Sequence, residues 1–99
     1  MEITKALDGD LVVLTLSGKL DTLTAPELQD VLIPELNSKN SVVLDFSGLS
    51  QISSAGLRVL LMSERTAKMN EVSLTLKNVS SVIEEIFNMT GFSSLLSFE

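Results

Sequence analysis

Short apolar runs alternate along this chain with segments of helical spacing, and that order limits the folds that it can adopt. Residues 11–16 and 41–46 are rich in leucine and valine and have the length of strands buried in a sheet. The segment between them has apolar residues at helical spacing, namely Leu28, Val31, Leu32 and Leu36. Because strands joined through a helix lie parallel in one sheet, this order predicts an α/β fold.

The N-terminal segment adds a hairpin to this sheet. Ile3, Lys5 and Leu7 alternate with their neighbours, and the turn dipeptide Asp8-Gly9 follows them directly. This pattern is typical of two antiparallel strands joined by a tight turn, the second strand being the run at 11–16.

The C-terminal half continues the alternation of strands and helices. We expect a helix over 55–69, a strand over 72–76 and a helix from 81 that Gly91 ends in a left-handed conformation. A short last strand is expected within 95–98. The whole chain, residues 1–99, is then one domain in which helices pack against a mixed, mostly parallel sheet.

Local signals mark where two of these helices begin. Thr24 and Glu27 form a capping box, and Ser81 and Glu84 form a second one. Pro34 lies inside the first helical stripe, where its ring costs about 3 kcal/mol in an undistorted helix. We therefore expect a kink or an early end of that helix at Pro34.

The residue inventory removes much catalytic chemistry. The sequence has no histidine and no cysteine, so the usual general base, the thiol nucleophile and the common zinc ligands are missing. We expect no enzyme activity, no metal and no cofactor. The net charge of −6 disfavours nucleic acids and anionic membranes as partners and favours a protein partner. With no signal peptide and no spanning segment, the chain is expected to be a cytoplasmic monomer or weak dimer.

Two polar segments follow strands whose carboxyl ends meet at one edge of the sheet, where such folds bind ligands. They are the expected loops at 17–22 and 47–58. The second is rich in hydroxyls and leads into a helix, whose N-terminus favours a phosphate or another anion. Ser53 and Ser54 therefore fit either a phosphorylated surface or an ordinary N-cap. Binding of a nucleotide or another small ligand is a further alternative, although no P-loop or dinucleotide fingerprint is present.

Three segments resemble the motifs of STAS domains: GKLD at 18–21, VLDFSGL at 43–49 and ISSAGLRVL at 52–60. The ending IFNMTGF at 86–92 is similar to the family's last helix. The similarity extends over nearly the whole chain in the same order, and within the family it is to the anti-sigma-factor antagonists. It implies a STAS-like sandwich and a protein-binding switch that sequesters an anti-sigma factor while it is unphosphorylated.

The resemblance also implies roles for particular residues. In these antagonists, a serine in the loop Asp-Ser-(Ser/Thr/Ala)-Gly is phosphorylated by a kinase-type anti-sigma factor and dephosphorylated by a phosphatase. By position, Ser54 is the phosphorylated residue, Ala55 and Gly56 follow it, and Asp21 lies close to it. Ser53 stands where the family has the aspartate. This departure leaves open phosphorylation of Ser53 instead, or none at all, as in a STAS subunit of another complex such as a transporter.

Other residues near this site are expected to contact the partner. Lys19 and Arg58 flank the site, while Val59 and Met62 form an apolar ridge that is either exposed to a partner or covered by the fold. Asp45, at the end of a buried strand, is expected to accept hydrogen bonds from loop amides. The full set of expected partner contacts is Lys19, Asp21, Ser53, Ala55, Gly56, Arg58, Val59 and Met62.

Overall fold

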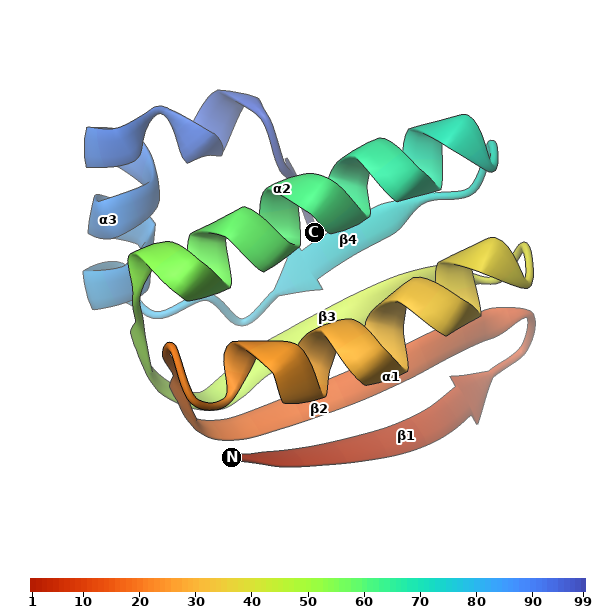
Figure 1. Ribbon diagram of the computed structural model, residues 1–99, viewed down its shortest axis with the longest axis horizontal. Coiled ribbons are helices and arrows are strands. Elements are labelled where there is room, and N and C mark those ends of the chain that lie inside the picture. Colours follow the sequence, from red (N-terminus) through yellow and green to blue (C-terminus); the bar gives the residue numbers. More distant parts are fainter.

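The computed structural model describes all residues 1–99, which form one sheet with helices packed against it (Figure 1). The elements in chain order are β1 (Glu2–Asp8), β2 (Leu11–Leu20), α1 (Ala25–Asn37), β3 (Ser41–Ile52), α2 (Ser54–Met69), β4 (Leu74–Lys77), α3 (Ser81–Thr90), the short 3-10 helix η1 (Phe92–Ser94) and β5 (Ser97–Phe98). This order matches the predicted one, including the N-terminal hairpin and the short last strand.

The five strands form a single sheet in the order β1-β2-β3-β4-β5, so β3 is the central strand. β1 and β2 are antiparallel, whereas β2, β3, β4 and β5 run parallel to one another. The parallel pairs are those that a helical segment connects along the chain, which is the geometry such connections require. The predicted α/β class with a mixed, mostly parallel sheet is confirmed.

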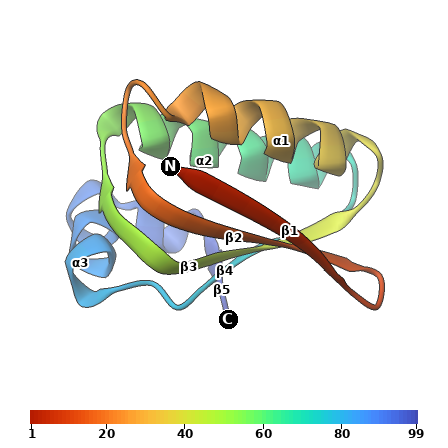
Figure 2. The same ribbon diagram turned by 90° about the horizontal axis from the view of Figure 1, so that it is seen from below.

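Helices α1 and α2 lie side by side on one face of the sheet (Figure 2). The strand residues that face them are apolar and fully buried, as in the row of paired neighbours Leu14, Leu44 and Leu76. The next residue of each strand faces the opposite way and is polar and half-buried, as in the row Thr15, Asp45 and Lys77. Because side chains alternate along a strand, the sheet has one apolar face under the helices and one largely polar face.

Helix α3 lies at one end of the molecule (Figure 2), where Phe87 anchors it. The ring centroid of Phe87 lies 6.4 Å from that of Phe46 in β3 and 5.7 Å from that of Phe98 in β5. Gly91 ends the helix with a φ of 82°, in the left-handed conformation that was predicted. The three rings therefore connect the central strand, α3 and the last strand.

Both predicted capping boxes are wrong. Thr24 is the N-cap of α1, but its hydroxyl makes no capping bond, because it accepts a hydrogen bond from the amide of Asp21 (2.9 Å) and donates one to the carbonyl of Lys19 (2.6 Å). The cap of α3 is Ser80, whose Oγ accepts from the amide of Ile83 at 3.3 Å. The hydroxyl of Thr24 has a competing local partner, and the cap of α3 lies one residue before the predicted one; the spacing of two residues reveals neither.

Helix α1 does not end early at Pro34. It continues to Asn37, and Figure 1 shows it as one uninterrupted helix. Pro34 is exposed, whereas Leu32 and Leu36 on either side of it are fully buried. Burying each of these leucines contributes about 1.5–3 kcal/mol, which together exceeds the cost of roughly 3 kcal/mol for an internal proline.

Candidate functional site

The prediction of loops at 17–22 and 47–58 is wrong, because residues 17–20 and 47–52 are strand and residues 54–58 belong to α2. β2 continues to Leu20 and β3 to Ile52, and the two stay paired from Ser17 opposite Gly48 to Leu20 opposite Ile52. The register shifts twice along this extension, which indicates β-bulges. Figure 2 shows the consequence: the ends of β2 and β3 curve toward the helical layer and lead into α1 and α2.

The curved strand ends hold the start of α2 in place. The amide of Ser53, the N-cap residue, donates a hydrogen bond to the carbonyl of Leu20 at 2.9 Å. Gly56 is buried against the same residues: a Cβ at this position would lie 2.7 Å from Cγ of Leu20 and 3.0 Å from Cγ1 of Ile52. The glycine is therefore needed because the first turn of α2 lies directly on the strand ends.

The two serines at this helix start differ in their surroundings. Ser54, the first residue of α2, is exposed. Ser53 is half-buried, and its Oγ is buried without a hydrogen-bond partner and does not cap the helix. The first backbone hydrogen bond of α2 is donated by Leu57 to the carbonyl of Ser53, so the amides of the three preceding helix residues have no acceptor in the protein. These amides give the exposed end of α2 a partial positive charge beside Ser54.

Asp21 closes the turn between β2 and α1. Its Oδ1 accepts hydrogen bonds from the amides of Leu23 (3.0 Å) and Thr24 (3.1 Å) and from the hydroxyl of Thr24 (3.2 Å). The hydrogen bond from the backbone of Thr24 is the largest cause that lowers the pKa of Asp21, and Lys19 lowers it further. Asp21 is therefore ionised and held by its own turn, with Oδ2 free of hydrogen bonds.

A shallow hollow of about 150 Å³ brings the turn and the start of α2 next to α3. It is lined by Leu20, Asp21, Ser50, Gln51, Ile52, Ser53, Val82 and Ile86. A larger hollow of about 460 Å³ lies between the end of β4, α3 and the C-terminus, and none of the predicted site residues lines it. Of the residues predicted for the site, Asp21 and Ser53 line the smaller hollow.

Asp45 was predicted to accept hydrogen bonds from loop amides, and the structure instead gives it one amide of its own strand and one side chain beyond β4. Its Oδ1 takes the amide of Ser47 at 2.9 Å and Nδ2 of Asn78 at 3.1 Å. Partial burial raises the pKa of Asp45, but these hydrogen bonds together outweigh the burial and the pKa is lowered. Asp45 fixes the chain where β3 passes into its bulged extension, on the polar face of the sheet.

The sequence matches a known family over almost its whole length. The family model described as Mlab, STAS domain, matches residues 3–97. The chain belongs to the STAS domain family. This STAS domain is 28% identical over 97 residues to the anti-sigma-B factor antagonist of Staphylococcus epidermidis, and the match covers 97% of the chain and 90% of that protein.

Solved structures share the fold of this STAS domain. An anti-sigma factor antagonist from Mycobacterium paratuberculosis matches with a TM-score of 0.88 at 18% identity, over 98% of the chain and 83% of that structure. The Bacillus cell fate determinant SpoIIAA in its phosphorylated form matches with a TM-score of 0.76 at 18% identity, over 99% of the chain and 91% of that structure. The arrangement of β2, β3 and α2 around Ser54 thus lies within a fold that these proteins have in common.

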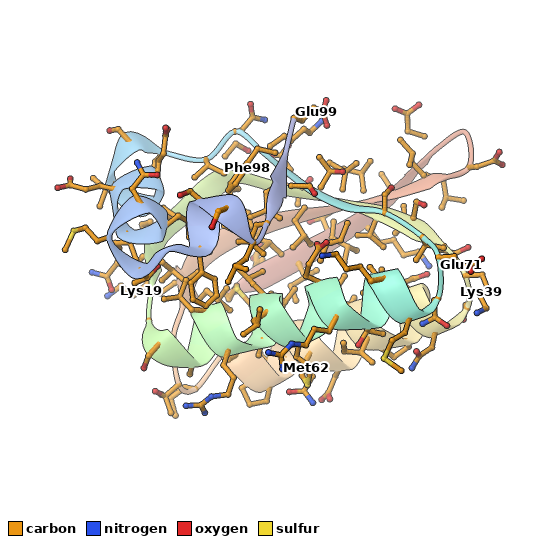
Figure 3. The ribbon with its side chains drawn as sticks, turned by 90° about the horizontal axis from the view of Figure 1, so that it is seen from above. Lys19, Lys39, Met62, Glu71, Phe98 and Glu99 are labelled. Atoms are coloured by element: carbon orange, nitrogen blue, oxygen red, sulfur yellow. The ribbon has the colours of Figure 1, made fainter.

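The STAS domain exposes only some of the residues predicted to contact a partner. Lys19, Ser54, Arg58 and Met62 are exposed, Asp21, Ser53 and Ala55 are half-buried, and Gly56 and Val59 are buried. Figure 3 shows Lys19 at the end of the molecule where α2 begins and Met62 further along that helix. The predicted partner contacts of Gly56 and Val59 are wrong, because Gly56 packs on the strand ends and Val59 belongs to the core.

Sequence reasoning missed the contribution of α3 to this site. Val82 is 63% exposed and Ile86 half-buried, and both line the hollow beside Ser53. The sequence did carry a signal for this second apolar face of α3. Val82 and Ile86 are four residues apart, as are the buried residues Ile83 and Phe87.

Charges around the site are unpaired. The one salt bridge of the structure joins Lys5 and Glu35, so neither Lys19 nor Arg58 has a carboxylate within bonding distance. No group of three or more acidic, histidine or cysteine side chains is arranged to hold a metal ion. None of the helices has both the length and the apolar character needed to cross a membrane.

Proposed function

We propose that this STAS domain is a cytoplasmic anti-sigma-factor antagonist whose binding is switched by phosphorylation of Ser54. The observation that carries the proposal is the exposed Ser54 hydroxyl on the first residue of α2, beside three helix amides without acceptors. Relatives that match along nearly the whole chain are antagonists of this kind, and SpoIIAA exists in a phosphorylated form. In the unphosphorylated state, the domain binds a kinase-type anti-sigma factor through Ser54 and the exposed side of α2.

The chemistry of the switch needs no catalytic group from this chain. The anti-sigma factor transfers the γ-phosphoryl group of ATP to Oγ of Ser54. A P–O bond to Oγ forms, the bond to the β-phosphate breaks with release of ADP, and a base of the kinase takes the hydroxyl proton. A separate phosphatase hydrolyses the phosphoserine. Asp21 is the one carboxylate among the residues that line the hollow beside Ser53, and its Oδ1 already accepts hydrogen bonds in its own turn, so we propose that the domain itself is not an enzyme.

The phosphate acts by charge. A phosphoserine carries about −1.5 to −2 charges at neutral pH, and at a helix N-terminus the helix tolerates this charge. The partner surface that was packed against the Ser54 hydroxyl then faces a dianion. A loss of two to three kcal/mol in binding corresponds to roughly 30–150-fold lower affinity. The fold is left intact, and the partner is released.

The structure also supports Ser54 over Ser53 as the acceptor. A kinase must reach the hydroxyl, and Oγ of Ser53 is buried while Ser54 is exposed. The absence of a carboxylate at position 53 favours a second candidate, a STAS subunit of another complex, such as a transporter, that is never phosphorylated. A nucleotide site is disfavoured, because the hollow of about 150 Å³ at this position is smaller than the 300–1,000 Å³ typical of small-molecule sites.

The experiment is an affinity capture from the native lysate with matched baits. Ser54→Ala and Ser54→Asp are compared with Ser81→Asp, which places the same charge on the exposed first residue of another helix, α3. We expect a protein with an ATP-binding kinase domain to bind the Ser54→Ala and Ser81→Asp baits and to be lost from Ser54→Asp. The recovered kinase should then phosphorylate the wild-type chain on the peptide that contains Ser54. Equal capture by all baits would instead support the unphosphorylated subunit.

A further inference from the structure

Arg58 lies one helical turn after Ser54 on the same face of α2. Both residues are exposed, and Arg58 makes no salt bridge and no side-chain hydrogen bond in the structure. Residues four apart on a helix have Cβ atoms about 5–6 Å from each other. An unpaired guanidinium is thus held next to the hydroxyl that we propose is phosphorylated.

The direction of the side chains brings these groups together. In an α-helix each Cα–Cβ bond is tilted toward the N-terminus, so the long side chain of Arg58 leans back over the turn that contains Ser54. Arginine presents a planar set of donors that matches two phosphate oxygens, which makes it the best side chain for this contact. The amides of residues 54–56, which have no acceptor in the protein, belong to the same first turn.

We propose that Arg58 binds the phosphate of phosphorylated Ser54 within the same helix. The proposal rests on the proposed function, since it concerns the modified state of the same residue. It involves no further covalent step: the guanidinium donates two hydrogen bonds to oxygens of a phosphate that is already attached to Oγ. Arg58 is then engaged in the domain itself and is no longer available to a partner.

One phosphorylation therefore changes the charge of the partner-binding surface at two positions. A dianion appears at Ser54, and the cation at Arg58 is neutralised one turn away. The other charged groups near the start of α2 are Lys19, which is exposed, and Asp21, which is held in its turn. The side of the site formed by α3 contributes the apolar residues Val82 and Ile86. Arg58 is the cation of α2 that lies one helical turn from the phosphate.

The test uses the full chain with phosphoserine incorporated at position 54, so it does not depend on finding the cellular kinase. The pH titration of the phosphate is followed by phosphorus NMR in the wild type, in Arg58→Gln and in Arg65→Gln. Arg65 is the matched control, because it is an exposed arginine on the same helix but eleven residues from Ser54. A third variant, Arg58→Lys, keeps the charge but not the planar pair of donors.

We expect the second pKa of the phosphate to be higher in Arg58→Gln than in the wild type by roughly 0.15–0.4 unit, because the cation that is lost favours the dianion. Arg65→Gln should match the wild type, and Arg58→Lys should fall between the two. An unchanged pKa in Arg58→Gln would overturn the proposal, as would an equal shift in Arg65→Gln. If the pKa shifts as expected but Ser54 is never phosphorylated in cells, the proposed function is contradicted and the proposed contact between Arg58 and the phosphate is not.

Discussion

The contact between Gly56 and the strand ends gives a prediction that the structure makes quantitative. In Gly56→Ala the new methyl group would lie 2.7 Å from Cγ of Leu20 and 3.0 Å from its carbonyl oxygen. Overpacking of this kind costs about 1–3 kcal/mol, and the better helix propensity of alanine returns up to about 1 kcal/mol. We expect a net loss of roughly 0.5–2 kcal/mol in the free energy of unfolding, measured by urea denaturation followed by circular dichroism.

A double-mutant cycle with Leu20→Ala isolates the cause. Leu20→Ala removes the Cγ atom that the new methyl would meet, so the cost of Gly56→Ala should fall by at least about 0.5 kcal/mol in that background. Leu20→Ala alone should cost about 2–5 kcal/mol, since Leu20 is fully buried. If Gly56→Ala costs the same with and without Leu20, the close approach of helix and strand is not the reason for glycine at this position.

Three further predictions concern the cap of α3 and two of the carboxyls with a shifted pKa, Glu64 and Asp45. Ser80→Ala should lower the free energy of unfolding by about 1 kcal/mol and Ser81→Ala should leave it nearly unchanged, in thermal and urea unfolding, because Ser80 alone caps α3. Burial raises the pKa of Glu64 above 4.5, so its contribution to stability is present below pH 4.5 and is lost as the pH rises through the folded-state value. Glu64→Gln should therefore have a larger free energy of unfolding than the wild type at neutral pH. A variant that is less stable than the wild type at neutral pH would contradict the burial of this carboxyl. The pKa of Asp45 is lowered below 3.8, so its hydrogen bond from Ser47 contributes stability above that pH that is lost on acidification. Asp45→Asn should reduce the slope of stability against pH in this acid range, which unfolding curves between pH 2 and 5 would reveal.

The sequence was sufficient for the order of elements because the signals were local and strong. The apolar runs and the stripe that includes Leu28 and Leu32 each depend on the burial of one face. The alternation in residues 3–7 predicted a strand correctly, although Ile3 is only half-buried and Leu7 is exposed. Gly91 closed its helix as expected for the same reason, since the left-handed residue follows from its lack of a Cβ. The resemblance added the position of Ser54, which spacing alone could not separate from an ordinary cap.

The errors arose where long-range contacts decide the local structure. Serine and glycine at 47–50 indicated a loop, but pairing with β2 makes this segment part of β3. Val59 was grouped with Met62 as a ridge, whereas packing of α2 against its neighbours buries Val59 and leaves Met62 36% exposed. The hydroxyl of Thr24 likewise bonds in the turn at Asp21, which the spacing of Thr24 and Glu27 does not reveal. The residue pattern within one segment does not show which other strand or helix will pair with it or bury it.

The hydrogen bond from Ser53 to Leu20 has a consequence for how fast and how selectively a signal can be transmitted. Because this bond and the packing of Gly56 attach the start of α2 to the paired ends of β2 and β3, the recognition surface is already ordered before any partner arrives. A preorganised surface loses little conformational entropy on association, and no refolding step delays its response. In the switch that we propose, the lifetime of each state would be set by the enzymes that add and remove the phosphate, because the domain itself needs no slow change of conformation.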